Sequence, residues 1–389
     1  MRQARTVLST YSADVFGVCS ALFELGGMTV MHDASGCNST YATHDEPRWY
    51  DTDSLVFISA LTEMEAIMGD DEKVLSDMLE AIKALRPKFA ALAGTPIPMM
   101  TGCDLASIAA QLERRSGIPC FGFDTNSMRS YLCGASEALL AVARRLTDKG
   151  AVMRPGTVNI LGATPLDFSV NGSIPAMAER LRAGGWEVIS TWAMGSSLSD
   201  LSRAGEAQVN LVVSGVGMKT ALALRERFGT PYVVGTPTGA AFSARILETL
   251  AQTAHDGICR MAFSETEAPQ AGDIFVIGEG VLSRSLAAAV SMECGVTPRV
   301  VYPLELLPEL DGMLSAGDLH AMEEEDIQSA CKNAELVVAD PLYQPILPAG
   351  CRFLPMPHEA FSGRMFRRDI PELPNLNIKT WFSQAERNA

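Results

Sequence analysis

Short runs of apolar residues alternate with longer amphipathic segments along almost the whole chain. Short apolar runs bounded by polar or turn residues are typical of strands that are buried on both faces of a sheet. The longer segments repeat apolar residues at helical spacing and carry charges on the opposite face, which predicts helices packed against such a sheet. Regular strand–helix alternation of this kind predicts parallel sheets with helices on both faces, so the expected fold class is α/β.

The alternation begins anew twice, and this predicts three units. The predicted strands lie at residues 28–32, 55–59, 89–93, 120–123, 157–161, 186–191, 210–213, 232–234, 274–277, 299–302 and 336–339. The predicted helices lie at residues 71–85, 105–116, 136–147, 174–183, 219–228, 240–255, 283–293 and 327–333. We therefore predict three Rossmann-like units, at residues 1–150, 151–240 and 241–389, around a central cleft. In parallel sheets ligands bind beyond the carboxyl ends of the strands or in clefts between units.

Composition and charge narrow the class of protein. The chain has 389 residues, of which 47% are hydrophobic and 20% charged, and this is ordinary globular usage. The net charge of −15 argues against binding to nucleic acid or to an anionic membrane surface. No apolar run reaches the roughly 18 residues of a membrane span, and the N-terminal residues lack the apolar core of a signal peptide. We expect neither nucleic acid nor membrane as a partner.

The nine cysteines are scattered, and no CxxC pair occurs among them. This disfavours zinc ribbons and thioredoxin-type redox sites. Unpaired thiols in a long chain are typical of a reduced, cytoplasmic compartment.

Several catalytic and nucleotide-binding motifs are absent, including GxxxxGK[ST], GxSxG and HExxH. Gly278-Glu279-Gly280 follows a predicted strand, but position 283 is Ser where a dinucleotide fingerprint needs Gly. A strand-to-helix turn is the simpler interpretation. We therefore expect that the chain does not bind or hydrolyse ATP by itself.

The loop after the first predicted strand is the most informative segment. It contains Asp33-Ala34-Ser35-Gly36-Cys37, whose small residues would let a bulky ligand approach the backbone. Cys37 follows the carboxyl end of a strand, where parallel sheets place chemistry. From position alone an ordinary loop thiol is the favoured alternative. Downstream, the acid-rich segment that begins at Thr62-Glu63 suits the N-terminus of a helix.

Taken in order, these segments resemble component 1 of nitrogenase and its relatives. The resemblance includes the Gly-Cys loop with Tyr41, the Thr62-Glu63 segment that leads to Gly69-Asp70, and Asp124-Thr125-Asn126-Ser127. It continues through residues 158–162, 210–213, 228–232, 339–343 and 356–363, so it spans nearly the whole chain. The three Rossmann-like units of that family match the three units predicted above.

The resemblance implies an oxidoreductase that receives electrons from a separate ATP-hydrolysing iron–sulfur reductase. It also implies an iron–sulfur cluster, of the 4Fe-4S type, at a subunit interface, and a substrate or metallocofactor between the three units. The two ligand positions of the nitrogenase cofactor fall at Val213 or Ser214 and at Pro357, and neither holds the family's Cys or His. We therefore expect reduction of a small molecule or tetrapyrrole rather than dinitrogen. The chain resembles most the compact tetrapyrrole-reducing members, such as dark-operative protochlorophyllide reductase and nickel-sirohydrochlorin cyclase.

The resemblance also indicates candidate residues. Cys37 matches one of the family's three interface cysteines, and it is the expected metal ligand. The other two positions fall at Tyr11 or Ser12 and near Pro96, so Cys19 and Cys103, a few residues further on, are alternative ligands. The remaining candidates for lining or serving the site are His32, Tyr41 and Glu65 in the first unit and His358 in the third.

His358 is the expected general acid, because the pKa of an imidazole, near ~6.5, suits proton donation, although a solvated loop histidine is an open alternative. A homodimer would bring two copies of Cys37 together, and in a heterodimer a sister subunit would supply further cysteines. Two other functions stay open. One is a non-catalytic scaffold or carrier for a metallocluster or tetrapyrrole, and the other is a binding protein that has lost its clusters.

Overall fold

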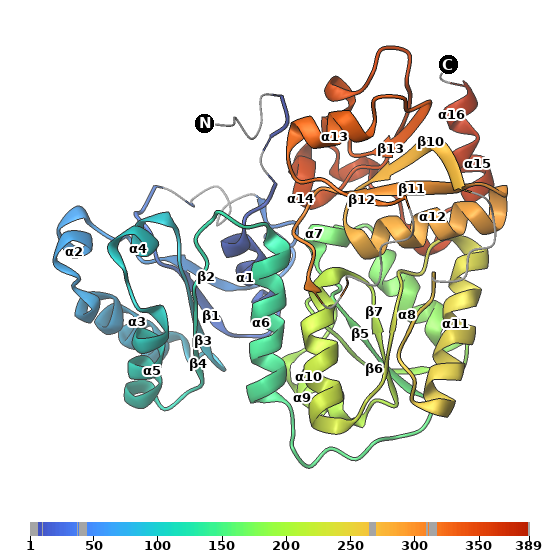
Figure 1. Cartoon of the computed structure of the whole chain (residues 1–389). Coiled ribbons are helices and arrows are strands. Elements are labelled where there is room, and N and C mark those ends of the chain that lie inside the picture. Colours follow the sequence, from blue (N-terminus) through green and yellow to red (C-terminus); the bar gives the residue numbers. More distant parts are fainter. Residues whose placement is uncertain are drawn as a thin grey trace.

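The computed structural model describes residues 7–9, 11–36, 38, 45–263, 270–308, 310 and 317–387. It confirms the predicted fold class, because these residues form three separate parallel sheets with helices packed on them. Figure 1 shows the three sheets in chain order, with α6 (Tyr131–Leu146) between the first sheet and the second. No helix of the described residues is long and apolar enough to cross a membrane.

The first sheet has the strand order β2-β1-β3-β4, and every neighbouring pair is parallel. Its strands are β1 (Met28–Met31), β2 (Leu55–Ile58), β3 (Ala90–Ala93) and β4 (Cys120–Phe123). The helices of this part are α1 (Asp14–Leu22), α2 (Glu63–Met68), α3 (Asp71–Leu85), α4 (Pro96–Thr101) and α5 (Leu105–Ser116). The predicted helices at residues 71–85 and 105–116 are confirmed, since Asp70 and Asp104 cap their N-termini.

A close crossing of α1 and α6 depends on two glycines. A Cβ atom at Gly134 would fall far inside van der Waals contact with the backbone of Asp14, and one at Gly17 would do the same with the backbone of Tyr131. Gly134 is a poor helix former, yet it lies inside α6 because only hydrogen fits there. The helix begins at Tyr131, five residues before the predicted start at 136.

The second sheet has the order β6-β5-β7-β8-β9 and is also parallel. Its strands are β5 (Thr157–Leu161), β6 (Glu187–Thr191), β7 (Val209–Val212), β8 (Tyr232–Val234) and β9 (Arg260–Met261). The helices are α7 (Pro165–Phe168), α8 (Ser173–Ala183), α9 (Leu198–Ser202), α10 (Met218–Phe228) and α11 (Gly239–Asp256). The strand β9 lies beyond residue 240, so this sheet continues past the point where the third unit was expected to begin.

The third sheet has the order β12-β11-β10-β13-β14. Its strands are β10 (Gln270–Ile277), β11 (Thr297–Tyr302), β12 (Leu319–His320), β13 (Leu336–Ala339) and β14 (Arg352–Pro355). The helices are α12 (Gly280–Cys294), α13 (Glu324–Ala330), α14 (Glu359–Ser362), α15 (Ile378–Phe382) and α16 (Gln384–Arg387). The helix predicted at 327–333 begins three residues earlier, because the acids at its start occupy the favourable first turn.

The three sheets share one large apolar core. It includes side chains of α1 and α6, of the second sheet and of the third sheet, and most are fully buried. A smaller separate core fills the space between the first sheet and the helices α3 and α5. The shared core holds the sheets in a fixed arrangement, so a site that lies between them is preorganised.

Candidate functional site: a buried acid–histidine cavity

A cavity with an empty volume of about 540 Å³ lies where the second and third sheets meet. It is lined by segments that follow the strands β5, β10 and β14, so three carboxyl ends of parallel strands open onto it. Figure 1 shows α7 and α14 between the two sheets, and these helices contact each other. Its walls are mostly apolar, with Phe168, Leu282, Leu286, Met356 and Phe361 among the lining side chains. This is the place and character expected of a ligand site in an α/β protein.

Three ionisable side chains line the cavity among the described residues, namely Asp167, Glu279 and His358. They are 3%, 1% and 7% exposed, so all three are withdrawn from bulk water. Ionised groups are costly to bury unless they are paired, and such groups occur preferentially at functional sites. The cavity therefore combines an apolar wall with a small number of convergent polar groups.

The carboxylate of Asp167 is only half satisfied. Its Oδ1 atom accepts a hydrogen bond from the hydroxyl of Tyr131 at the start of α6, and it lies 3.5 Å from Nε2 of His358. Its Oδ2 atom has no hydrogen-bond partner, and neither ring nitrogen of His358 has one. Buried polar atoms are almost always paired, so unpaired ones indicate a ligand or ordered water. Asp167, Tyr131 and His358 come from different parts of the chain and meet at this point.

The backbone of His358 is fixed from behind. Asp340, which follows β13, accepts the His358 backbone N–H at 2.8 Å and the Ser362 hydroxyl at 2.7 Å on its Oδ2 atom. The His358 ring stacks on Phe361 with a centroid separation of 4.4 Å. The alternative of a solvated loop histidine is wrong, because His358 is buried and held on two sides.

Glu279 is the N-cap of α12, and both its oxygens accept backbone hydrogen bonds. Oε2 accepts the N–H of Leu282 at 2.9 Å, and Oε1 accepts that of Gly215 at 3.0 Å. Complete burial, and then the negative charge of Asp167, raise the pKa of this carboxyl to about 7. Burial followed by Asp167 likewise raises the pKa of Tyr131 well above its usual value. The cavity therefore contains a carboxyl group that exchanges a proton near neutral pH.

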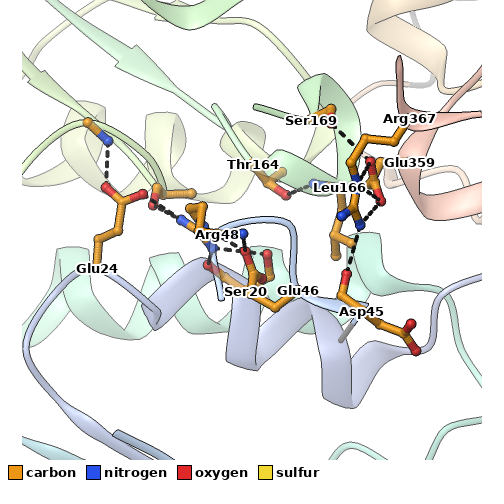
Figure 2. Close-up of polar contacts among 12 residues, drawn as sticks. Ser20, Glu24, Asp45, Glu46, Arg48, Thr164, Leu166, Ser169, Glu359 and Arg367 are labelled. Atoms are coloured by element: carbon orange, nitrogen blue, oxygen red, sulfur yellow. Dashed lines mark hydrogen bonds and ion pairs between the residues drawn. The ribbon is translucent and has the colours of Figure 1, made fainter. Parts of the chain in front are cut away.

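A second buried polar cluster ties the first unit to the second, as Figure 2 shows. The guanidinium of Arg48 donates to Glu46 at 2.7 Å and to Glu24 at 2.9 Å, and it also donates to the backbone carbonyls of Ser20 and Ala193. Burial lowers the pKa of Arg48, but the two carboxylates raise it by more, so the net shift is upward. Arg48 is thus a permanently charged clamp between α1 and the end of β6.

A third cluster in Figure 2 fixes the helix beside His358. The carboxylate of Glu359 accepts two hydrogen bonds from Nε of Arg367, at 3.0 and 2.9 Å, and one from the Ser169 hydroxyl at 3.0 Å. Arg367 also donates to the backbone carbonyl of Asp45 at 3.2 Å. These contacts join α14 to the segment after α7 and to the first unit.

The structure disperses the other residues that the sequence indicated. Cys37 and Tyr41 lie outside the described residues. His32 is buried at the end of β1, where its Nδ1 atom lies 2.9 Å from the Ser59 hydroxyl. Burial lowers the pKa of His32, and nearby carboxylates, chiefly that of Asp71, oppose this shift. Glu65 completes the capping box of α2 with Thr62, whose backbone hydrogen bond lowers the pKa of the Glu65 carboxyl.

The two alternative cysteine ligands differ in access. Cys19 is fully buried in the shared core, and burial raises its pKa strongly. Cys103 is partly exposed, and burial and then the negative charge of Asp71 raise its pKa to about 11. A cluster ligand must be a thiolate that reaches the metal. The described residues hold no group of three or more Cys, His, Asp or Glu that fits a metal site. By themselves they do not fit an iron–sulfur cluster.

Sequence reasoning missed Asp167, Glu279 and Tyr131. A usable signal existed for the two acids, because each follows closely on the carboxyl end of a predicted strand. Glu279 was interpreted only as part of a turn. Tyr131 carried no such signal, since it lies at the start of a helix and reaches Asp167 only through the packing of α6.

Comparison with known proteins defines the class. Residues 15–302 match the family of nitrogenase component 1 type oxidoreductases, and the chain belongs to that family. The resemblance in the sequence is thereby confirmed, and so is the nitrogenase-like oxidoreductase class. A solved structure titled "Nitrogenase Cp1 at pH 6.5" superposes with a TM-score of 0.71 over 99% of this chain and 94% of that chain. At 14% identity this likeness shows the fold alone.

The curated relatives are more distant in coverage. The chain is 28% identical over 197 residues to one subunit of the light-independent protochlorophyllide reductase of Nostoc punctiforme, which is 47% of this chain and 38% of the relative. It is 25% identical over 179 residues to the nitrogenase iron-molybdenum cofactor biosynthesis protein NifE of Clostridium pasteurianum, covering 46% of this chain and 38% of the relative. The match thus spans less than two fifths of the length of either relative.

Proposed function

We propose that the chain is the catalytic subunit of a nitrogenase-like reductase that reduces a small molecule or a tetrapyrrole, and not dinitrogen. The observation that carries this proposal is the buried cavity at three strand ends, with Asp167, Glu279 and His358 in its wall. Reduction of an organic substrate consumes a proton for each electron, so a catalytic chamber needs proton donors that water does not reach. Membership of the component 1 family supports the electron-transfer half of the proposal.

His358 is the proposed general acid. Its two ring nitrogens lack hydrogen-bond partners and lie against the cavity, and Asp340 holds its backbone in place. Asp167, 3.5 Å from Nε2, stabilises the protonated imidazole and orients it. Glu279 supplies a second exchangeable proton nearby. Each residue thus has a task that its position supports.

Electrons are proposed to come from an ATP-dependent iron–sulfur reductase. The chain is proposed to act in the cytoplasm, as a homodimer or with a component 1-like sister subunit. Because the described residues do not fit a cluster, we assign ligation of an interface 4Fe-4S cluster to Cys37 and to a second chain. Such a cluster supplies one-electron transfer when it is bound.

An exposed apolar patch on α2 and α4 supports docking of that reductase. Met64, Ile67 and Met68 share one face of α2 and are 68%, 71% and 71% exposed, and Met100 of α4 is 80% exposed. Contiguous exposed apolar surface indicates an interaction site. Acids surround it, since Glu63 and Glu65 lie on α2 and Asp70 and Asp71 follow it. A second copy would bring like charges together, so the fitting occupant is a reductase with a basic rim.

The docking surface has a direct test with a matched control. Ile67→Asp places a charge in the patch and should raise the apparent KM for the reductase at least tenfold, with unchanged substrate binding. Val152→Asp changes an equally exposed apolar residue of the linker and should have no effect. Equal behaviour of the two variants would remove α2 from the docking surface.

The catalytic proposal is tested by anaerobic expression with the reductase, iron analysis, electron paramagnetic resonance and turnover. His358→Gln should lower turnover about a hundredfold or more and leave iron content unchanged. His320→Gln is the matched control, because His320 lies in the same unit and bonds the Leu304 carbonyl. Turnover of His358→Gln within twofold of wild type would exclude His358 as the acid. A chain that never takes up iron, alone or with its partners, would refute the reductase.

A second candidate is a non-catalytic scaffold or carrier for a metallocluster or tetrapyrrole. The similarity to NifE favours it, since the name of that protein describes cofactor biosynthesis. Substrate turnover with the ATP-dependent partner separates the two, because a scaffold binds and releases its cargo without reducing it.

A further inference from the structure

The inter-unit cavity presents hydrogen-bond acceptors and negative charge, and this restricts what it can hold. Its ionisable lining groups are two carboxyls and one imidazole, and the described lining residues include neither Lys nor Arg. The lining hydroxyls belong to Ser173 and Ser283. Most known anion sites use guanidinium, ammonium or convergent backbone N–H groups, and here the nearby N–H groups of Gly215 and Leu282 are already bonded to Glu279.

Asp167 makes the restriction sharper. Its carboxylate is fully buried, Tyr131 occupies Oδ1, and Oδ2 is left without a donor. A purely internal role as counter-ion to His358 would still leave Oδ2 and one ring nitrogen of His358 unpaired. An acceptor buried to this degree and facing a cavity needs a donor from outside the chain.

We propose that this cavity binds a small neutral or cationic molecule that donates N–H groups to Asp167 Oδ2, and that it excludes anionic ligands. The inference rests on the proposed function, because it names the substrate class of the same site. A ligand carboxylate here would add a third negative charge to an apolar enclosure, whereas an amidine-like or amine-like group would pair with the charge already present. Tetrapyrroles that must bury their peripheral carboxylates in this cavity are thereby disfavoured.

The surroundings of Glu279 predict a proton linkage. The titratable and charged groups that act on it or respond to it are Tyr131 in α6, Asp167 in α7, Arg284 in α12, Tyr302 in β11, Glu305 after β11 and His358 before α14. A bound cation favours the ionised form of Glu279 and lowers the pKa of its carboxyl. Binding should therefore release protons near neutrality, and affinity for the cation should rise as the pH increases through about 7.

Three probes of nearly one shape test the charge preference, namely acetamidinium, acetamide and acetate. Their binding to the full-length protein is measured by ligand-observed NMR titration and by calorimetry in two buffers of different ionisation enthalpy. We expect acetamidinium to bind at least tenfold more tightly than acetate, with acetamide between them. Asp167→Asn should reduce acetamidinium affinity at least tenfold, and Glu279→Gln should abolish its pH dependence. Asp200→Asn, in the capping box of α9, is the matched control and should change neither.

Acetate binding as tight as acetamidinium binding, or acetamidinium binding that is unchanged in Asp167→Asn, would overturn the proposal. If Asp167→Asn does not fold, the order of the three probes on wild-type protein and the pH profile of Glu279→Gln still decide it. The measurement needs neither reductase nor cluster. A chain that prefers acetamidinium but never accepts electrons would refute the reductase and leave the ligand class intact.

Discussion

Replacing Arg48 by Met should be among the most damaging single changes to the stability of this protein. Met retains most of the length and apolar contact of the side chain but removes every donor. The guanidinium holds Glu46 at 2.7 Å and Glu24 at 2.9 Å, and donates to the carbonyls of Ser20 at 2.7 Å and Ala193 at 3.1 Å. The substitution would therefore cut the link between α1, the segment at 45–52 and the second sheet.

The expected loss follows from the burial of the partners. The Glu46 side chain is 0% exposed and that of Glu24 is 19% exposed, so only Glu46 is left as a fully buried, uncompensated carboxylate. Removing one member of a buried ion pair costs about 3–5 kcal/mol in free energy of unfolding. The double variant Arg48→Met/Glu46→Gln removes the stranded charge as well, and it should be about 2 kcal/mol more stable than Arg48→Met alone.

The assay is equilibrium unfolding in urea, followed by tryptophan fluorescence. Trp49 is a local reporter, since it adjoins Arg48 and packs against Phe23 with a ring separation of 6.2 Å. Midpoints and slopes of the transitions are compared for wild type, both single variants and the double variant. A loss below about 1 kcal/mol in Arg48→Met, or a double variant no more stable than the single one, would show that the cluster is not a clamp.

Three further changes probe the cavity and its supports. Glu279→Gln should flatten the pH dependence of unfolding: burial raises the pKa of the native carboxyl from 4.5 to about 7, so its contribution is fully present below pH 4.5 and is lost as the pH rises through 7, by at most about 3 kcal/mol. Urea unfolding at pH 5 and pH 8 measures this. Gly134→Ala should destabilise by about 1–3 kcal/mol despite a better helix propensity, because its Cβ would overlap the Asp14 backbone; thermal unfolding checks it. Asp340→Ala should cost about 1–3 kcal/mol and lower turnover about tenfold by freeing the His358 backbone N–H, and a stable variant with full turnover would contradict its positioning role.

Much of the fold could be predicted from one-dimensional pattern. The strands β3 and β4 were recognisable because residues 90–93 and 120–123 are apolar runs bounded by polar or turn residues, and burial on both faces demands that pattern. The strand β14 was not predicted, because Arg352-Phe353-Leu354-Pro355 is only partly buried and ends in proline. Proline is tolerated there since β14 is the edge strand of its sheet.

The candidate site was predictable only in part. His358 was recognised from its residue type, but the pattern around it could not reveal that it is buried against Phe361. The meeting of Asp167 with His358 depends on how the second sheet packs on the third, and local periodicity carries no information about that packing. Glu279 was visible as an acid after a strand, yet a turn explained it equally well until its burial was known.

The contrast between the two buried clusters indicates where function lies. Around Arg48, every donor that points inward meets a carboxylate or a carbonyl, so the cluster is explained by stability alone. Around Asp167, a buried oxygen and two ring nitrogens of His358 lack partners although the surrounding core is closely packed. A fold that satisfies its polar groups elsewhere can tolerate such a local cost, because stability is summed over the whole chain whereas selection for binding or catalysis acts on one site. The unsatisfied cluster is therefore the stronger candidate for chemistry, and the satisfied one for the rigid frame that positions it.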